Sequence, residues 1–296
     1  MKILQGGVPK CGNFWMYKII QQVLHKTGGN TTSFIEQHPI YPLAKAWNLN
    51  FPDQARIDVL EINELQYSYR ISSIFQMPIE DIKKYIDQTN HVWTHSPVCK
   101  KSGEVFNLFD KKVYIIRDPR DRAVSAAKYY CSDYMLRYFP QEEKDPKVFL
   151  QKNFDQLMQE WVWNVWDHLR LSQEFNIHII FFENLLSDFQ RELGRLLDYL
   201  ELDLDPPQKE ELENEVSFST LKERNPKHLK KGTSGYWKEA LSKEQIEKAA
   251  IIAEPLMQFL NYTTEGSPSV DFHPGHNSSI FEELKQEIIL SQEPLY

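Results

Sequence analysis

The chain has 296 residues, of which 41% are hydrophobic and 26% charged, and its 34 Lys and Arg against 42 Asp and Glu give a formal net charge of −8. This composition is typical of a globular chain and excludes a wholly disordered, collagenous or coiled-coil protein. Three widely spaced cysteines, Cys11, Cys99 and Cys131, exclude a disulfide framework and a CxxC metal site.

The first predicted elements are a strand, a glycine-rich loop and a helix. Residues 1–5 predict the strand, and the loop follows it directly. Apolar residues then recur every three or four positions, which predicts a helix that ends at Gly28 and Gly29. Farther along the chain, residues 91–94 predict a second short strand.

A third strand is predicted at residues 113–116, which are all apolar or aromatic. Asp118 and Pro119 follow it and have the residue types of a helix N-cap and of a first helical position. We therefore expect one helix from this point through about Arg137.

Residues 177–182 predict another apolar strand, followed by Ser187 and an amphipathic helix. The apolar stripe of this helix consists of Phe189, Leu193, Leu196, Leu197 and Leu200. Apolar strands that alternate with helices predict a single α/β domain with a central parallel β-sheet flanked by helices. In such sheets ligands bind at the carboxyl ends of the strands, which is where the motifs described below lie.

We expect the domain to span residues 1–262 and residues 263–296 to form a C-terminal tail, which is amphipathic over residues 280–290. The N-terminus reaches Gly6 and Pro9 before the apolar core of a secretory signal could form. The longest apolar run is far shorter than the ~20 residues that cross a bilayer. These features predict a cytoplasmic protein with no membrane span.

Positive charge is concentrated in three segments of this acidic chain. Residues 1–40 carry +3, residues 111–128 carry +4 and residues 222–238 carry +5, which leaves −20 for the rest. If the segments meet in space, they would bind an anion. The acidic remainder would repel a nucleic acid, so a small, multiply charged anion fits better. Ordinary solvated charge clusters are the alternative.

The loop at residues 7–13, GVPKCGN, has two glycines five positions apart, as a phosphate-binding P-loop does. It lacks the Lys-Ser/Thr pair that follows the second glycine in nucleotide triphosphatases, and Lys10 lies inside the loop instead. Backbone N–H groups near Gly12 and at the start of the next helix would bind an anionic group. A tight turn made only for packing is the alternative.

Arg117 lies at the end of a predicted strand, and Ser125 lies about two turns into the next helix. An arginine binds a phosphate through two parallel hydrogen bonds, and a serine adds a third. In the alternative, Arg117 pairs with Asp118 or Asp121 at the helix cap and Ser125 packs on the sheet.

His95 follows a predicted strand in the sequence WTHSP. A lone histidine is more often a structural residue than a base. Beside a phosphate-binding loop, however, a neutral imidazole with an ordinary pKa of ~6.5 is suited to accept a hydroxyl proton.

Several motifs together resemble those of the sulfotransferases that use 3′-phosphoadenosine 5′-phosphosulfate (PAPS). PKCGNFW at 9–15 resembles the family's PKSGTTW loop, and 114–130 resembles its 3′-phosphate motif. KKGTSGYWKE at 230–239 resembles the RKGxxGDWK segment. WTHSP at 93–97 is similar to KTHLP, and 181–202 resembles the YEDL helix. The resemblance covers the expected domain and not the tail, and it implies a P-loop-like fold.

The resemblance also implies site residues. The 5′-phosphosulfate would be held by Lys10, Cys11, Gly12, Asn13, Phe14 and Trp15. The 3′-phosphate would be bound by Arg117, Ser125, Lys230, Lys231 and Gly232, and the adenine would be lined by Ser217, Phe218 and Trp15. His95 would be the general base, and Lys10 would stabilise charge on the departing adenosine bisphosphate. No metal is implied.

The chain departs from the family pattern at several positions. Cys11 replaces a serine, and Asn13 and Phe14 replace two threonines, so some hydroxyl contacts to phosphate are lost. Phe182 replaces the tyrosine of YED. Trp93 replaces a lysine beside the base, and we expect its ring to form one wall of an apolar acceptor pocket; the alternative is a catalytic position that has lost its cation.

Two further expectations follow from these departures. Loop N–H groups and Lys10 would surround Cys11 with positive potential, which predicts a lowered thiol pKa and a reactive thiol. Residues 238–247 keep only the ends of the family's dimerisation motif, which leaves the oligomeric state open.

The sequence thus predicts a sulfotransferase that moves a sulfuryl group from PAPS to a hydroxyl of a small acceptor. Aromatic residues are frequent between positions 33 and 80, which favours a lipophilic or aromatic acceptor over a glycan, and a structural core is the alternative explanation for them. A catalytically silent nucleotide-binding protein is the alternative, and it would keep Lys10 and Arg117 but would not need His95. A P-loop kinase is disfavoured by the missing Gly-Lys-Ser/Thr.

Overall fold

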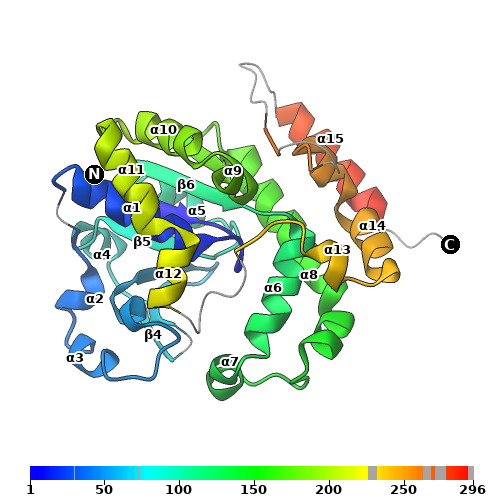
Figure 1. The fold of residues 1–296 in the computed structure, drawn as a ribbon, viewed down its shortest axis with the longest axis horizontal. Coiled ribbons are helices and arrows are strands. Elements are labelled where there is room, and N and C mark those ends of the chain that lie inside the picture. The colour runs from blue at the N-terminus through cyan, green and yellow to red at the C-terminus, as the bar shows by residue number, and fades with distance from the viewer. Residues whose placement is uncertain (30, 73, 226–231, 263–267, 271–277, 293–296) are drawn as a thin grey trace.

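The protein is built around one central sheet (Figure 1). The computed structural model describes residues 1–29, 31–72, 74–225, 232–262, 268–270 and 278–292. The sheet has seven strands in the order β4, β3, β2, β5, β1, β6, β7. The strands are β1 (Ile3–Gly6), β2 (Asp58–Ile62), β3 (Tyr67–Ile71), β4 (Phe75–Ile79), β5 (His91–Thr94), β6 (Lys111–Ile116) and β7 (Ile177–Phe181).

The middle of the sheet is parallel and buried. β1 pairs in parallel with β5 and β6, and the register places Leu4 beside Val92 and Lys112. β6 pairs in parallel with β7, and β5 pairs in parallel with β2. β3 and β4 extend the sheet as antiparallel strands. The prediction of an α/β domain with a mostly parallel sheet is therefore correct, with an antiparallel edge that the sequence did not reveal.

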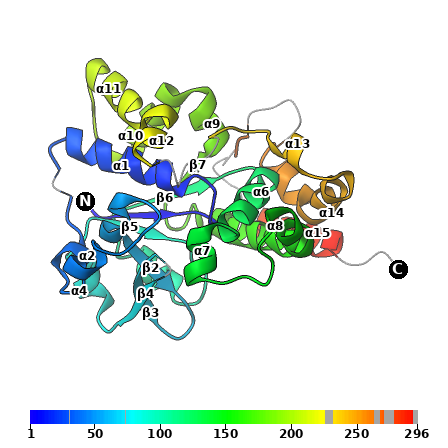
Figure 2. The ribbon, with the colours of Figure 1, turned by 60° about the horizontal axis from the view of Figure 1, so that its bottom comes forward.

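One face of the sheet is covered by helices from both halves of the chain (Figure 2). Ile3, Val113 and Ile115 point to this face, because side chains alternate along a strand. They pack against α1 (Asn13–Lys26), α9 (Phe182–Ser187), α10 (Phe189–Leu200), α11 (Pro206–Val216) and α12 (Phe218–Arg224).

The other face carries the larger core. Leu4, Tyr114 and Ile116 point to it and pack with the long helix α8 (Pro146–Leu171). The remaining helices of this core are α4 (Ile82–Asp87), α5 (Ser102–Phe106), α6 (Pro119–Tyr130), α13 (Trp237–Ala240), α14 (Lys243–Phe259) and α15 (Ser278–Gln292). Three short elements, α2 (Phe34–Gln37), α3 (Tyr41–Ala44) and η1 (Pro52–Arg56), pack beside the first strands.

The expected helix from Pro119 through about Arg137 is two helices in the structure. α6 ends at Tyr130, and α7 (Asp133–Tyr138) follows it. The side chain of Ser132 accepts a hydrogen bond from the Met135 N–H and caps α7. The prediction of one continuous helix was therefore wrong, because an N-cap serine interrupts it.

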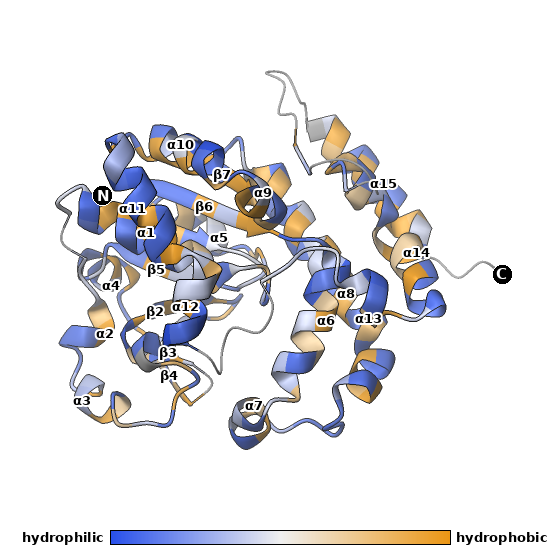
Figure 3. Cartoon of the chain, in the orientation of Figure 1, coloured by the Kyte–Doolittle hydropathy of each residue, from blue (hydrophilic) through white to orange (hydrophobic). Residues whose placement is uncertain are grey.

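The amphipathic segment of the tail forms α15. Phe281, Leu284 and Ile288 are buried on α14 and α8, and the Trp166 indole N–H donates to the Phe281 carbonyl at 3.1 Å. Figure 3 shows hydrophobic and hydrophilic residues mixed along both α14 and α15. The division of the chain at residue 262 stays a prediction. No helix among the described residues has the length and apolar character that a bilayer crossing requires.

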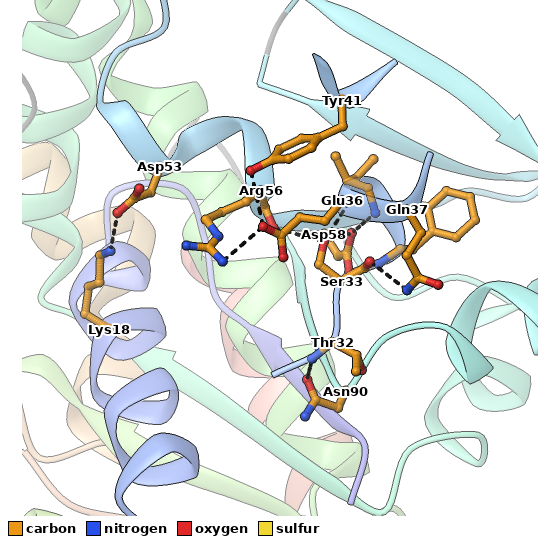
Figure 4. Close-up of polar contacts among 12 residues, drawn as sticks. Lys18, Thr32, Ser33, Glu36, Gln37, Tyr41, Asp53, Arg56, Asp58 and Asn90 are labelled. Carbon is orange, nitrogen blue, oxygen red and sulfur yellow. Dashed lines mark hydrogen bonds and ion pairs between the residues drawn. The ribbon is translucent and has the colours of Figure 1, made fainter. Parts of the chain in front are cut away.

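A buried carboxylate fixes the segment that precedes β2 (Figure 4). Asp58, 2% exposed, accepts hydrogen bonds from the backbone N–H groups of Phe34 at 2.8 Å and Ile35 at 2.9 Å. Glu36 forms an ion pair with Arg56 at 3.0 Å nearby. These contacts tie α2 and η1 to the start of β2.

Candidate active site

The candidate site lies where the parallel strands end. The loop after β1, His95 after β5 and Arg117 after β6 leave the sheet at the same edge, because these strands run in parallel. A cavity of about 340 Å³ lies there. The predicted residues that line it are Lys10, Gly12, Asn13, Phe14, Trp15, Trp93, His95, Arg117, Ser125, Phe218 and Gly232. Segments far apart in the sequence therefore meet in one cavity.

The loop after β1 needs both of its glycines. A Cβ at Gly7 would lie 2.5 Å from Oδ1 of Asn13, and a Cβ at Gly12, where φ is 98°, would lie 2.6 Å from the Phe182 ring. The Gly12 carbonyl accepts from the Met16 N–H at 3.0 Å, so α1 begins immediately after the loop. The first N–H groups of a helix have no acceptor within it, and they bind anions.

Asn13, which stands where the family has a threonine, holds this loop in shape. Its side-chain amide donates to the Val8 carbonyl at 2.9 Å, and its own carbonyl accepts from the Gln5 side chain at 2.8 Å. Asn13 is 3% exposed. Asn13 thus lacks the hydroxyl of a threonine, and its hydrogen bonds instead connect the two ends of the loop.

Lys10 supplies a positive charge inside the cavity. Its backbone has a φ of 75°, in the left-handed region, and its ammonium lies 4.2 Å from the centroid of the Tyr129 ring. Burial, followed by the charge of Arg117, lowers the pKa of Lys10 to about 8. An anion bound beside Lys10 and Arg117 would raise the pKa of Lys10 again, because its negative charge favours the ammonium form.

Arg117 lies next to Lys10 and over an aromatic ring. Its guanidinium carbon is 4.3 Å from the Phe182 ring centroid, and the guanidinium donates to the carbonyls of Lys10 at 3.3 Å and Thr233 at 3.0 Å. Within the described part of the chain, neither Lys10 nor Arg117 forms an ion pair with a carboxylate. Both cations are therefore available to an anionic ligand.

The two carboxylates after Arg117 in the sequence are engaged elsewhere. Asp118 pairs with Arg120 at 2.6 Å. Asp121 accepts from the backbone N–H groups of Gly235 at 2.6 Å and Trp237 at 2.8 Å. Neither carboxylate therefore forms the expected alternative ion pair with Arg117, although the charge of Arg117 acts on Asp121, and Asp121 anchors the segment after residue 231 beside α6.

Gly232 and Phe218 pack directly against each other. Gly232 has a φ of 62°, and a Cβ there would lie 2.1 Å from the Phe218 ring. Ser217, in contrast, does not line the cavity, and its side chain caps α12 by accepting from the Thr220 N–H at 3.3 Å. Lys230 and Lys231 lie outside the described residues.

The Trp15 ring lines the cavity and is held there by a hydrogen bond and two ring contacts. Its indole N–H donates to the Val216 carbonyl at 2.9 Å. The ring stacks on Phe189 at 6.1 Å between centroids and meets Phe182 edge-on at 5.6 Å. This arrangement presents an aromatic surface to the cavity, as an adenine ring would require.

Sequence reasoning did not single out Lys128. It lies on α6 three residues after Ser125, and both line the cavity. Its ammonium is 4.1 Å from the centroid of the Tyr236 ring. The spacing from Ser125 could have indicated Lys128, because residues three apart on a helix lie on the same face.

The expectation of a reactive Cys11 was wrong. Its side chain is 0% exposed in the core below the loop, and its backbone N–H is already bonded to the Val8 carbonyl at 3.2 Å. Burial raises the pKa of the Cys11 thiol to about 12, and this effect outweighs the opposing charges of Arg122 and Arg117. The thiol therefore faces the core rather than the anion-binding side of the loop.

His95 is bonded directly to the loop. Its Nδ1 lies 2.6 Å from the Gly7 carbonyl oxygen, and its Nε2 accepts from the Trp93 indole N–H at 3.1 Å. Burial, followed by the charge of Arg70, lowers the pKa of His95 to about 3. The imidazole is therefore neutral at physiological pH. No three His, Cys, Asp or Glu side chains gather as a metal site would need within the ranges that the structure describes.

Curated relatives and solved structures point to one family. Sulfotransferase 2A6 of Mus musculus is 24% identical over 169 residues, a match of 52% of this chain and 59% of that protein. The 3-beta-hydroxysteroid sulfotransferase of Cavia porcellus is 24% identical over 256 residues, which cover 81% of this chain and 78% of that protein. The chain thus spans little more than half the length of the first of these relatives.

Two solved structures share the fold. Mouse sulfotransferase SULT7A1 complexed with PAP has a TM-score of 0.56 and 18% identity, and the match covers 96% of this chain and 87% of that one. Retinol dehydratase complexed with retinol and PAP also has a TM-score of 0.56, at 15% identity, with 90% and 83% covered. The sulfotransferase domain family matches residues 2–260. The chain therefore belongs to the sulfotransferase family.

Proposed function

We propose that the protein transfers a sulfuryl group from PAPS to a hydroxyl group of a small acceptor. The observation that carries this proposal is the pair of cations without carboxylate partners, Lys10 and Arg117, in one cavity with a neutral His95 that is bonded to the anion-binding loop. Family membership supports the same reaction.

The described residues fit the two anionic ends of PAPS. At one end, Lys10 and the backbone N–H groups at the start of α1 would hold the phosphosulfate. At the other end, Arg117, Ser125 and Lys128 would hold the 3′-phosphate, with the segment that begins near Gly232 closing over it. The aromatic rings of Trp15 and Phe218 also line the cavity, and the adenine would pack beside them while the ribose joins the two anionic ends.

In the proposed reaction, the acceptor oxygen attacks sulfur in line with the departing group. The acceptor proton passes to Nε2 of His95 as the new S–O bond forms. The bond from sulfur to the bridging oxygen of the adenosine bisphosphate breaks at the same time. Lys10 stabilises the charge that develops on that bridging oxygen.

We further propose a lipophilic or aromatic acceptor. Phe51, Ile57, Val59 and Trp93 line the cavity on the side of His95, and such side chains suit an apolar molecule. The name of the Cavia porcellus relative, a 3-beta-hydroxysteroid sulfotransferase, points in the same direction. Several polar side chains line the same cavity, so the acceptor test below includes a glycan as the alternative.

Two measurements test the proposal. Calorimetry should show that adenosine 3′,5′-bisphosphate binds more tightly than ATP, and that its affinity falls as the salt concentration rises. Equal affinity for ATP would favour a kinase instead. Incubation with PAPS and a panel of a phenol, a long-chain alcohol, a 3β-hydroxysteroid and a hydroxylated glycan should then give transfer to an apolar acceptor. Bisphosphate binding without any transfer would favour the catalytically silent alternative.

A further inference from the structure

Both ring nitrogens of His95 already have hydrogen-bond partners. Nδ1 lies 2.6 Å from the carbonyl oxygen of Gly7, and Nε2 lies 3.1 Å from Nε1 of the Trp93 indole. A carbonyl only accepts and an indole only donates, so Nδ1 must carry the proton and Nε2 must offer its lone pair to Trp93. The structure therefore defines one neutral tautomer of His95, whose single lone pair is in use.

Protonation of His95 would break this arrangement. An imidazolium has an N–H at both nitrogens, so Nε2–H would face the indole N–H of Trp93. The charged groups that act on the ring oppose protonation as well: Arg70 on β3, Lys10 in the loop and Arg122 on α6. The capped, neutral form is thus favoured both by its hydrogen bonds and by its surroundings.

A base that accepts a hydroxyl proton must offer that same lone pair at hydrogen-bond distance. The acceptor hydroxyl and the Trp93 indole N–H therefore exclude each other at Nε2. We propose that Trp93 is a positioning residue that caps the base and leaves it only when the body of an acceptor displaces the indole. This inference rests on the proposed function, in which His95 is the base.

The surroundings of Trp93 suggest what can displace it. It lies on β5 between Gln5 of β1 and Val59 of β2, and its ring is tilted against Tyr17 at 6.0 Å between centroids. The ring is partly buried and lines the cavity with apolar neighbours. An apolar acceptor can replace these contacts as the ring turns away, whereas a water molecule cannot.

The cap would therefore protect PAPS from water. In the unwanted reaction, a water oxygen forms a bond to sulfur, the bond from sulfur to the bridging oxygen breaks, and the water proton passes to Nε2 of His95. The products are sulfate and adenosine bisphosphate. While the Trp93 indole N–H is hydrogen-bonded to Nε2, no base is available to activate a water molecule. PAPS is therefore consumed only when an acceptor displaces the indole.

Trp93→Phe tests the cap because it keeps an aromatic ring and removes only the N–H donor. Trp163→Phe is the matched control, since Trp163 lies on α8 and packs edge-on against Trp166 at 6.0 Å. The first readout uses no substrate: the rate at which diethyl pyrocarbonate modifies His95, which requires a free lone pair. The second readout is the release of adenosine bisphosphate from PAPS in water without acceptor.

We expect modification of His95 and acceptor-independent release each to rise about fivefold in Trp93→Phe, the factor that the loss of one ordinary hydrogen bond gives, and neither to change in Trp163→Phe. An unchanged modification rate in a folded Trp93→Phe protein would overturn the cap. If modification rises but PAPS is consumed neither in water nor with any acceptor of the panel, the cap stands and the proposed function fails.

A measurement on the unaltered protein covers the case in which Trp93→Phe does not fold. The cap predicts that the Trp93 indole proton exchanges slowly with solvent, because it is bonded to His95. Exchange as fast as in an exposed tryptophan would contradict the proposal without any variant. Trp93→Leu, which also lacks the donor, should repeat the behaviour of Trp93→Phe.

Discussion

The Gly7 carbonyl oxygen accepts a hydrogen bond from Nδ1 of His95 at 2.6 Å. This bond joins the anion-binding loop to the proposed base, although the two residues are 88 positions apart in the chain. It also fixes which ring nitrogen carries the proton, because a carbonyl can only accept. Binding of a nucleotide to the loop and orientation of the imidazole are thereby linked.

Titration of His95 should report this link. With a pKa lowered to about 3, His95 should stay neutral from pH 8 down to about pH 5 in the free protein. Adenosine 3′,5′-bisphosphate should raise the pKa, because its negative charge opposes that of Lys10. NMR of the ring protons measures both values, and an unchanged pKa in the complex would place the nucleotide away from His95.

The lowered pKa of His95 also affects stability. An unfolded histidine binds a proton near pH 6.5, whereas folded His95 does so only near pH 3. Its contribution to the free energy of unfolding is therefore fully present above pH 6.5 and is lost as the pH falls from there toward 3.

Arg117→Ala should weaken the binding of adenosine 3′,5′-bisphosphate by roughly 10- to 100-fold, since it removes a charge-assisted contact to phosphate. The dependence of affinity on salt should become shallower as well. Arg137→Ala is the control, because Arg137 lies at the end of α7 and does not line the cavity. Calorimetry at two salt concentrations measures both effects. Equal losses in the two variants would mean that only net charge matters.

Cys11 should resist alkylation at neutral pH. Its thiol is 0% exposed, and burial raises its pKa to about 12. Mass spectrometry after iodoacetamide treatment should find the label on the partly exposed Cys99 and Cys131 first. Rapid labelling of Cys11, with protection by the nucleotide, would show instead that the thiol faces the anion site.

Asp58→Ala should lower the free energy of unfolding by roughly 2–4 kcal/mol, because it leaves the buried N–H group of Ile35 and the partly buried one of Phe34 without an acceptor. Asp53→Ala is the control, since Asp53 is exposed and forms a surface ion pair with Lys18 at 3.1 Å. Urea denaturation of the three proteins measures the difference.

The pH dependence gives the Asp58 test a second arm. Burial raises the pKa of Asp58 to about 6, although its hydrogen bonds act in the opposite direction. Folded Asp58 therefore holds its proton more tightly than the unfolded chain does, and the stability this provides is lost as the pH rises from about 4 through 6. The advantage of the wild type over Asp58→Ala should shrink over that range. If the stability difference between the wild type and Asp58→Ala grew over this range, the hydrogen bonds to the carboxylate would outweigh the effect of burial on the pKa of Asp58.

The elements that carry the site were predictable because each has a local signal. Apolar runs marked β1, β5, β6 and β7, and Asp118 with Pro119 marked the start of α6. The antiparallel strands β3 and β4 lacked such a signal. Their pairing depends on neighbours along the sheet rather than on the short sequences themselves.

The site was predictable as a set of positions but not as a set of contacts. The motifs indicated that Lys10, His95 and Arg117 would meet, and they line one cavity. They could not show that Cys11 turns into the core, because a loop residue can face either side. The bond from Trp93 to His95 was also hidden, since His95 lies just after β5 and the side-chain rotamers of both residues are set by tertiary packing.

Transfer of a labelled sulfuryl group from PAPS to an acceptor, measured for the wild type and for His95→Ala, tests the central claim most directly. We expect transfer by the wild type and a loss of at least ~10²-fold in His95→Ala, with the affinity for adenosine 3′,5′-bisphosphate changed little. Equal rates of transfer by the two proteins would contradict the assignment of His95 as the base. Absence of transfer by the wild type to every acceptor tried, with PAPS left intact, would contradict the proposed reaction itself.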